Sequence, residues 1–392
     1  MRRAALLATL LVATLLVPAC GGGGSSTLPP HDAGHGGGDG GTTADGSPGS
    51  DAQAAHDGPG AGSDATGDTG SGSGDGGAGD ASGPARPLIA YASGYGPDIQ
   101  WLAVDPATGA LSASGELAAF GAAPSFLAVD TAGEHLYAVD ESAPGRVGAY
   151  SIDATTGALT FQNAVPSGGD GPPYVGLDPL GKWALVANYT SGSASVLPVK
   201  ADGSLGAATA TVSAGSLAHM TVADPSDAFV FVPCLGSDWV AQYVFDAAAG
   251  TLTPNSVPHM ATAKGAGPRH LAFHPDGKLA YLVDETASTV SELALDAAAG
   301  TLSIVHTVST LPPGFTGTST AAEVHVHPSG KWLFTSNRGD DSIAVFPLDA
   351  QGAIGAPTFT KSGGATPRDF SLDPAGTHLY VANQGAGDVV AF

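Results

Sequence analysis

Short apolar runs separated by turn residues recur between Ser125 and Phe392, and one arrangement of two runs around a Pro-x-Gly or related turn occurs six times. The copies read AVDTAGEHLYAVDE, GLDPLGKWALVANY, VADPSDAFVFVPCL, AFHPDGKLAYLVDE, HVHPSGKWLFTSNR and SLDPAGTHLYVANQ. The residues that precede the turns, spaced by 48, 46, 50, 53 and 46, are Asp130, Asp178, Asp224, His274, His327 and Asp373. A period of this size built from short strands is typical of β-propeller blades rather than of a helical solenoid.

Each full unit contains four runs of strand character. In the fourth copy they read HLAFH, KLAYLVDE, VSELALD and LSIVHTV. Tight turns between the third and fourth runs begin with Asp and end with Gly, as in Asp246-Ala-Ala-Ala-Gly. There Asp can bond its own backbone and Gly can adopt a positive φ. With no apolar helical period after the first 20 residues, the pattern predicts an all-β, seven-bladed β-propeller.

The ends of the repeat region predict an incomplete ring. IAYASGY, IQWLAVD and LSASGEL supply strands two to four of a first blade, while RDFSLD, HLYVANQ and DVVAF supply strands one to three of a last one. This count gives about 26 strands where seven four-stranded blades need about 28. We expect the two further strands to follow Phe392, or else the ring to close with exposed strand edges.

The first 20 residues have the layout of a secretory signal. Arg2 and Arg3 precede an apolar run that is too short for a comfortable membrane span. The sequence LVPAC resembles a bacterial lipobox, with Cys20 as the lipidated residue, and plain secretion is the alternative. We therefore expect an exported protein of the cell envelope that contacts a membrane only through this lipid anchor.

Residues 21–86 have the composition of a disordered tether. They include 23 Gly and 9 Asp and almost no large apolar side chain, so they cannot bury enough surface to offset their ordering entropy. His31, His35 and His56 lie in this segment, where a solvated spacer is a simpler interpretation than weak metal scavenging. The propeller domain is then expected over residues 87–392.

Charge and cysteine content narrow the function further. The chain has a formal net charge of −23, and from Pro87 onward 27 acidic residues face 10 basic ones. This balance argues against nucleic acid and against an anionic membrane surface as partners. If Cys20 is lipidated, Cys234 cannot form an intrachain disulfide, and its apolar surroundings FVFVPCL favour a buried structural thiol over a nucleophile.

The repeat predicts where a site forms, because the start of each first strand and the end of each second strand meet at the mouth of the central channel. Only four arginines follow Pro87, and three of them, Arg269, Arg338 and Arg368, fall at these positions. The acids and histidines at equivalent positions include His219, His270, Glu285 and Glu323. Arg is suited to a carboxylate, phosphate or carbonyl oxygen, so the pattern favours a small-molecule site. An ion-pair network that ties the blades together is the alternative.

Other chemistry has less support in the sequence. His325 and His327 alternate with Glu323, but His327 repeats the position of His274 before the turn, so we expect no metal site. The chain has no Gly-rich phosphate loop, G-x-S-x-G elbow or CxxC motif. We therefore expect neither a nucleotide cofactor nor any other cofactor.

Three stretches at these positions carry a family resemblance: GPRHLAFHPDGKLAYLVDETASTV, AAEVHVHPSGKWLFTSNRGDDSIAVF and TPRDFSLDPAGTHLYVANQ. The chain from about Leu88 to Phe392 resembles the seven-bladed lactonase family typified by 6-phosphogluconolactonase of the propeller type, together with carboxy-cis,cis-muconate cyclase. The match is looser at Ser216-Leu217-Ala218-His219. The resemblance implies a catalytic set of His219, Arg269, Glu285 and Arg338. We assign His270, Glu323 and Arg368 to substrate binding.

The resemblance implies a metal-independent lactonase that hydrolyses a sugar lactone. In this hypothesis Glu285 or His219 is the general base, Arg338 stabilises the oxyanion and Arg269 holds a substrate carboxylate or phosphate. Export argues for a non-phosphorylated aldonolactone, since phosphorylated sugar lactones are cytoplasmic metabolites. The alternatives are a non-catalytic surface propeller that binds a ligand or protein, and a muconate-type cyclase or isomerase. The oligomeric state stays open.

Overall fold

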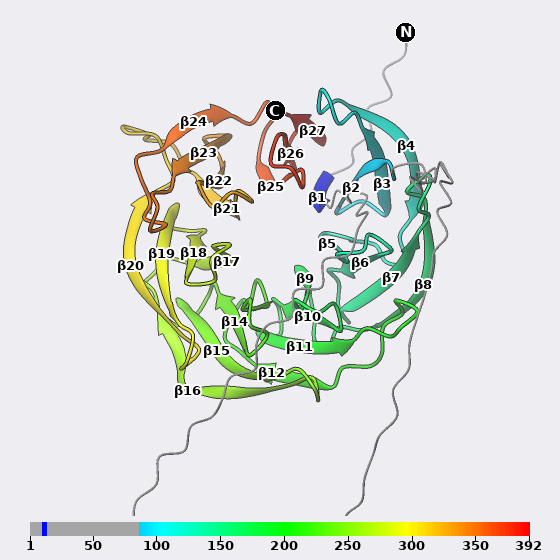
Figure 1. The fold of residues 1–392 in the computed structure, drawn as a ribbon, viewed down its shortest axis with the longest axis horizontal. Coiled ribbons are helices and arrows are strands. Elements are labelled where there is room, and N and C mark those ends of the chain that lie inside the picture. Colours follow the sequence, from blue (N-terminus) through cyan, green and yellow to red (C-terminus); the bar gives the residue numbers. More distant parts are fainter. Residues whose placement is uncertain (1–9, 14–85) are drawn as a thin grey trace, which may run out of the picture. The chain divides into compact units, whose positions relative to one another are not determined.

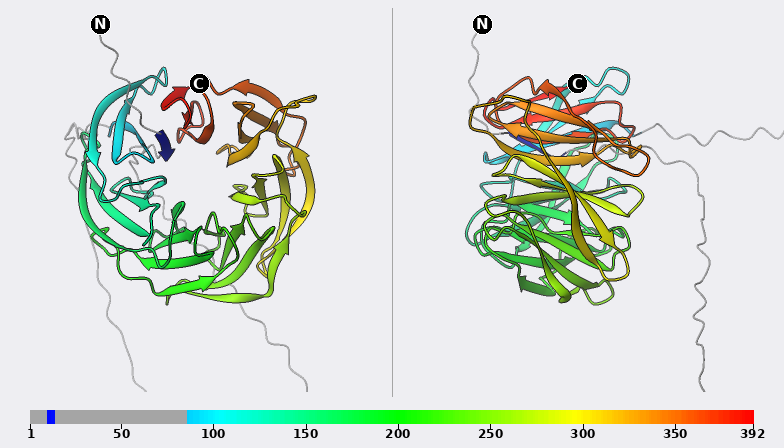
Figure 2. Two further views of the ribbon diagram at one scale, coloured as in Figure 1. Left: turned by 180° about the vertical axis from the view of Figure 1, so that it is seen from behind. Right: turned by 90° about the vertical axis from the view of Figure 1, so that its left-hand side faces the viewer.

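The described residues form β-strands arranged as seven antiparallel sheets around a central axis (Figures 1 and 2). A computed structural model describes residues 10–13 and 86–392. The sheets follow one another in chain order as blades 1 to 7, which confirms the predicted seven-bladed propeller. No helix among the described residues is long and apolar enough to cross a membrane.

The strands of the seven blades run from the innermost position to the outermost position in chain order. Blade 1 contains β1 (Leu10–Ala13), β2 (Leu88–Gly94), β3 (Asp98–Val104) and β4 (Leu111–Ala118). Blade 2 contains β5 (Leu127–Val129), β6 (His135–Asp140), β7 (Arg146–Ile152) and β8 (Leu159–Pro166). Blade 3 contains β9 (Tyr174–Leu177), β10 (Trp183–Asn188), β11 (Ser193–Pro198) and β12 (Ala210–Ser213).

The remaining blades repeat this order. Blade 4 contains β13 (Val222–Ala223), β14 (Phe229–Cys234), β15 (Trp239–Asp246) and β16 (Thr251–Ala261). Blade 5 contains β17 (Pro268–Phe273), β18 (Leu279–Asp284), β19 (Thr289–Asp296) and β20 (Thr301–Ser309). Blade 6 contains β21 (Thr320–Val326), β22 (Trp332–Arg338), β23 (Ser342–Pro347) and β24 (Thr358–Lys361). Blade 7 contains β25 (Pro367–Leu372), β26 (Leu379–Asn383) and β27 (Asp388–Ala391).

The two ends of the ring differ in how they meet the expectation from the sequence. The predicted three strands of blade 7 form, and within the described chain β27 pairs only with β26. In blade 1 the innermost place is not empty as predicted, because β1 pairs there antiparallel with β2, Leu10 opposite Gly94. Backbone pairing needs only an extended segment, and this one lies inside the predicted signal sequence. Cys20 and the predicted tether up to residue 85 lie outside the described residues and stay predictions.

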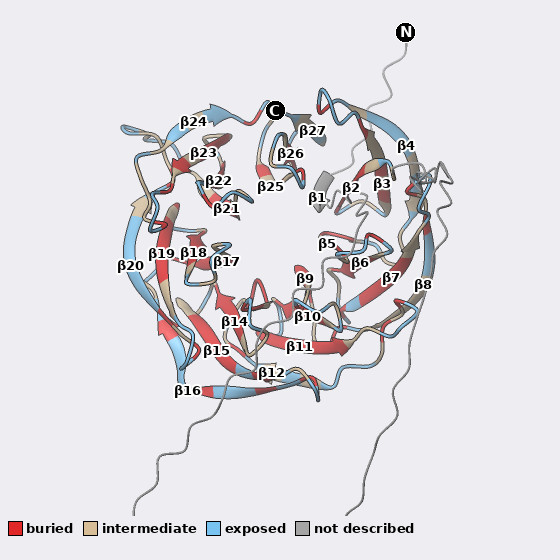
Figure 3. Cartoon of the chain, in the orientation of Figure 1, coloured by how far each residue is buried: buried red, intermediate tan, exposed pale blue. Residues whose placement is uncertain are grey.

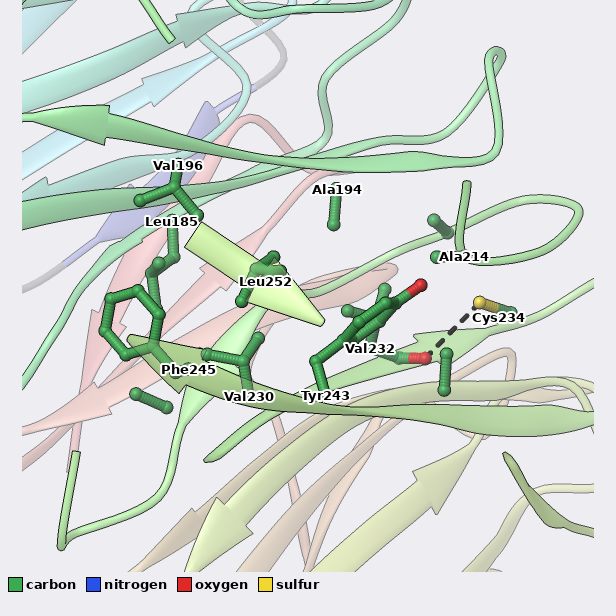
Figure 4. Packing of buried hydrophobic residues seen from close by; sticks show 13 residues of the cluster. Leu185, Ala194, Val196, Ala214, Val230, Val232, Cys234, Tyr243, Phe245 and Leu252 are labelled. Carbon is green, nitrogen blue, oxygen red and sulfur yellow. Dashed lines mark hydrogen bonds between the residues drawn. The ribbon is translucent and has the colours of Figure 1, made fainter. Parts of the chain in front are cut away.

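The core lies between neighbouring blades rather than at the centre of the ring. Second and third strands are buried along most of their length, whereas the outermost strands are largely exposed (Figure 3). One cluster joins Leu185 and Val196 of blade 3 to Val230 and Tyr243 of blade 4 (Figure 4). Cys234 is fully buried in this cluster, and burial raises its thiol pKa to about 12. The predicted burial of this thiol is confirmed.

The turn residues that define the repeat are structural. Asp178 and Asp224 accept backbone N–H groups from the start of the following strand, from Trp183 at 2.7 Å and from Phe229 at 2.8 Å. His274 stands at the same place in blade 5, and its Nε2 instead donates to the carbonyl of Gly330 in blade 6, at 3.0 Å. A histidine at this position therefore links two blades.

Candidate active site

Arg269, Glu285 and Arg338 meet at one end of the central channel, as the superimposed repeat predicts. Arg269 lies near the start of β17, Glu285 follows β18 and Arg338 ends β22. Glu285 Oε2 lies 3.1 Å from Arg269 Nε and 2.9 Å from Arg338 Nη2. The glutamate side chain is 23% exposed, so a carboxylate held between two guanidinium groups faces the mouth of the channel.

The backbone of the inner strands explains how consecutive residues reach this site. A β-bulge interrupts the pairing of β17 between Pro268 and His270, and equivalent irregularities lie in β21 between Ala321 and Val324 and in β25 between Pro367 and Asp369. A bulge adds an unpaired residue and re-aims side chains that regular alternation would place on opposite faces. At the mouth, the bulged strands therefore present two neighbouring residues to the site.

The two guanidinium groups differ in their exposure to solvent. The Arg269 side chain is 3% exposed, and its Nη1 donates to the carbonyl of Ala322. Burial and the charges of Arg368 and Arg338 lower its pKa to about 10, although Glu285 and Glu323 oppose the shift. Arg338 is less enclosed at 12% exposure, and its Nη2 also donates to Ala321 O at 3.2 Å. Its pKa is lowered, mainly by burial.

His219 lies beside the arginines, in the segment that precedes β13. Its backbone N–H donates to Pro233 O at 2.9 Å, and its Nδ1 lies 3.1 Å from His270 Nε2. Burial, followed by the positive charge of Arg269 and the neighbouring His270, lowers the pKa of His219 well below its ordinary value. The ring is therefore neutral near pH 7 and can accept a proton there.

His270 and Glu323 lie below the mouth and continue this contact. His270 Nδ1 is 2.7 Å from Glu323 Oε2, and both side chains are almost fully buried. Burial lowers the pKa of His270 to about 4. For Glu323 the effect of burial is outweighed by His270, His325 and Arg269, which lower its pKa to about 2. Their predicted contact with substrate remains a prediction.

Arg368 occupies the rim of the site with an aromatic partner. Its Nη2 donates to Tyr95 Oη at 3.0 Å, and its guanidinium carbon lies 5.5 Å from the centroid of the Tyr95 ring. Tyr189 also lies at the rim, with its ring edge-on to His219 at 5.6 Å between centroids. Neither Tyr189 nor Tyr95 is among the site residues predicted from the sequence. Both tyrosines come just after a second strand, as Glu141 and Glu285 do, and this equivalence could have identified them from the sequence.

Asp369 is a second group that sequence reasoning left out of the site. It follows Arg368 at the bulge of β25 and is 4% exposed. Burial, followed by the charge of Glu323, raises the pKa of its carboxyl group well above the ordinary value. Its position next to Arg368 repeats that of His270 next to Arg269, so the repeat alone could have identified it.

His325 of β21 and His327, which follows that strand, do not join these groups in a metal site. His327 uses Nε2 to donate to Gly376 O in blade 7, at 2.9 Å, and its Nδ1 lies 2.7 Å from Ser329 Oγ. His325 Nε2 is 3.9 Å from Glu323 Oε1. Within residues 10–13 and 86–392, no group of three or more His, Cys, Asp or Glu side chains is arranged to hold a metal ion.

Two buried guanidinium donors at the mouth have no acceptor in the described part of the chain, and they are the Nε atoms of Arg338 and Arg368. The buried Nε of Arg269 lies 3.1 Å from Glu285 Oε2 in an ion pair. Buried donors are ordinarily paired with protein or water. The mouth therefore combines positively charged donors, a carboxylate and a neutral imidazole, a set suited to acyl chemistry on a small molecule with carbonyl oxygens.

Two curated proteins are similar to this chain in sequence. The chain is 33% identical to 6-phosphogluconolactonase of Bacillus subtilis over 281 residues, which cover 69% of this chain and 79% of that protein. It is 35% identical over 250 residues to 6-phosphogluconolactonase of Pectobacterium carotovorum, covering 64% and 74%.

A solved structure has a similar fold over most of its length. The periplasmic gluconolactonase of Pseudomonas aeruginosa superimposes with a TM-score of 0.70 at 31% sequence identity, covering 75% of this chain and 87% of that one. The family model described as lactonase, 7-bladed beta-propeller, matches residues 88–392. The chain therefore belongs to the seven-bladed β-propeller lactonase family.

Proposed function

We propose that this protein is a lactonase that hydrolyses the ester bond of a sugar lactone at the mouth of its central channel. The observation that carries the proposal is the Glu285 carboxylate held between Arg269 and Arg338, at 3.1 and 2.9 Å, beside the neutral His219. The names of the relatives, two 6-phosphogluconolactonases and a gluconolactonase, support the same reaction.

The proposed reaction is addition of water to the lactone carbonyl followed by ring opening. A base removes a proton from water while its oxygen bonds to the carbonyl carbon, and the developing oxyanion needs a positively charged donor. Arg338 is suited to the oxyanion because it is more exposed than Arg269. The carbon–oxygen bond of the ring then breaks, and the leaving oxygen takes the proton back. The product is an open-chain hydroxy acid.

The burial of Arg269 favours a supporting role. Its side chain is enclosed by Glu285, Glu323 and Ala322 O, so its charge orients Glu285 rather than reaching far into the mouth. Arg368 has a rim position and a buried Nε without a partner, which favours it as the group that binds a polar end of the substrate. Positive charge for the oxyanion comes from arginine in this scheme. We expect hydrolysis to continue in the presence of EDTA.

We propose a non-phosphorylated aldonolactone as the substrate. The predicted export of the chain favours a neutral lactone, and the similar structure from Pseudomonas aeruginosa is named a periplasmic gluconolactonase. The export itself, through a signal sequence and lipidation of Cys20, is part of this proposal.

The first test is lactone hydrolysis by the purified full chain, measured with a pH indicator on a panel of sugar lactones, before and after Glu285→Gln. This change removes the charge between Arg269 and Arg338, and we expect kcat to fall at least about 100-fold. Glu134→Gln is the control, because Glu134 lies on an exposed turn and its side chain is 58% exposed. Near-normal rates for folded Glu285→Gln would reject the assignment of Glu285.

The same panel tests the two alternative functions. A binding module would bind a lactone without turning it over, and its affinity would not depend on an ionised Glu285. A muconate-type cyclase or isomerase would act on an unsaturated dicarboxylic acid while leaving aldonolactones intact. Turnover of an aldonolactone that depends on Glu285 excludes both alternatives.

A further inference from the structure

A layer of mostly buried side chains lies directly below the mouth. Each is the second of two neighbouring residues at the start of an inner strand; the members are the half-buried Phe126 and the buried Tyr174, Met220, His270, Glu323 and Asp369. His270 packs edge-on against the rings of Tyr174 and Phe126, with centroids 5.6 and 5.9 Å away. His270 is 1% exposed, so it is enclosed by protein and has little surface for a substrate.

One hydrogen bond joins this layer to His219 above it, and a second one continues within the layer. His219 Nδ1 lies 3.1 Å from His270 Nε2, and His270 Nδ1 lies 2.7 Å from Glu323 Oε2. The glutamate is itself held in place: Oε1 accepts the backbone N–H of Val324 at 3.0 Å, and its own N–H donates to Ser336 Oγ at 3.0 Å. The Glu323 side chain is therefore held in a fixed position beside His270.

The position of each proton in these contacts can be assigned in order, starting from Glu323. An ionised carboxylate can only accept, so His270 Nδ1 must carry the proton that it shares with Glu323. A neutral His270 then has only a lone pair at Nε2, so the contact with His219 requires the proton on His219 Nδ1. His219 is thereby left with its lone pair on Nε2. Each step is set by the donor and acceptor capacity of one ring.

We propose that His270 and Glu323 are positioning residues that hold His219 in the Nδ1–H tautomer and so make Nε2 the basic nitrogen of the site. The proposal rests on the proposed lactonase function and assigns the general base to His219. Nε2 takes a proton from water as the oxygen bonds to the lactone carbonyl carbon and the carbonyl electron pair moves onto oxygen. When the ring carbon–oxygen bond breaks, the leaving oxygen takes that proton, so His219 returns to its starting state.

The charged groups around these three residues favour a neutral His219 before the reaction. Arg269, Arg338 and Arg368 all act on His219 from the mouth, and each positive charge disfavours a resident imidazolium ring. Glu323 provides a negative charge beneath His270, with Arg269 Nη1 3.8 Å from its Oε2. Asp369 lies beside Glu323 in the same layer, where its raised pKa favours the protonated carboxyl group. The imidazolium therefore forms only during the reaction.

The test uses two variants of the full chain and two measurements. His270→Phe keeps a ring between Tyr174 and Phe126 but removes both nitrogens, whereas Glu323→Gln keeps the shape of the side chain and removes its charge. We expect kcat to fall at least about 100-fold in each, with KM within about threefold, because the base presents the wrong nitrogen. Glu292→Gln is the matched control, since Glu292 is a buried glutamate of β19 that accepts Ile354 N–H at 3.2 Å.

The second measurement does not depend on activity. Nitrogen-15 NMR of histidine-labelled protein reports the tautomer of His219, assigned by comparison with His219→Gln. We expect the Nδ1–H form in the wild type and its loss in both variants. A wild-type His219 in the Nε2–H form overturns the proposal, as does a folded variant that keeps both the tautomer and kcat. If no lactone is hydrolysed, the proposed function fails, but the NMR result still tests whether His270 and Glu323 set the tautomer of His219. Failure of the proposed function and failure of this inference are therefore distinguishable.

Discussion

At the scale of single residues, the site depends on a few charges placed next to one histidine. His219 is buried near Arg269, Arg338 and Arg368, whose charges add to burial in lowering its pKa. A general base must be unprotonated to act, so the acid limb of kcat/KM against pH is expected below the ordinary range of histidine. Above that limb His219 is neutral and the reaction proceeds; as the pH falls through it, protonation stops the reaction.

Removal of one of these charges should move the acid limb in a known direction. Arg368→Gln takes a positive charge away from His219, so the pKa of His219 rises and the limb of kcat/KM moves to higher pH. Arg146→Gln is the control, because Arg146 lies outside the mouth and over the ring of Phe120, at 5.1 Å. A limb that stays at the same pH in Arg368→Gln would show that His219 is not the titrating base.

At the scale of elements, blades are joined by hydrogen bonds from second strands to the turns of the next blade. Tyr91, Tyr137 and Tyr281 donate from their hydroxyl groups to the carbonyls of glycines at the turns between the third and fourth strands of the next blade, and the acceptors are Gly157, Gly203 and Gly352. These tyrosines are fully buried. The Tyr380 hydroxyl in blade 7 is also buried but has no hydrogen-bond partner among the described residues.

This difference predicts opposite effects of the same substitution. Tyr281→Phe removes a hydrogen bond of 2.6 Å and leaves Gly352 O unpaired, which should cost about 1 to 1.5 kcal/mol. A loss of this size lowers Tm by roughly 2 to 4 °C. Tyr380→Phe removes an unpaired buried hydroxyl, so its Tm should stay the same or rise. Calorimetry of both variants measures the contrast, and equal losses would contradict this account of the blade junctions.

At the scale of the whole molecule, the propeller region is strongly acidic, whereas positive and negative groups are nearly balanced at the mouth. From Pro87 onward 27 acidic residues face 10 basic ones. Arg269, Arg338 and Arg368 lie at the mouth with Glu141 and Glu285, and Glu323 lies directly below it. Beyond about 10 Å, an approaching substrate experiences mainly the net charge at low ionic strength. A neutral lactone is therefore not repelled, whereas a phosphorylated lactone is.

The salt dependence of kcat/KM measures this discrimination. For a neutral aldonolactone we expect less than about a twofold change between roughly 50 and 500 mM NaCl. For a phosphorylated lactone we expect kcat/KM to rise with salt, because screening relieves the repulsion from the acidic surface. A kcat/KM for the phosphorylated lactone that falls with salt would show that the arginines of the mouth dominate its approach.

The sequence alone determined the propeller and the mouth, because both follow from local rules that repeat. Alternating apolar strands, Asp and Gly turns and a period of 46 to 53 residues specify each blade, and superimposed copies bring Arg269, Glu285 and Arg338 to one end of the channel. The structure confirms this convergence through ion pairs with Glu285. This convergence follows from the regular spacing of the repeat copies rather than from any one segment of the chain.

Only the tertiary structure decided how the site is layered. Regular alternation would place Arg269 and His270 on opposite faces of β17, and the bulge that brings both to the axis depends on pairing with β18. The contacts of His219 with His270 and of His270 with Glu323 join residues 51 and 53 positions apart, across three blades. Burial, which sets the charge state of these groups, exists only once the ring of blades is assembled.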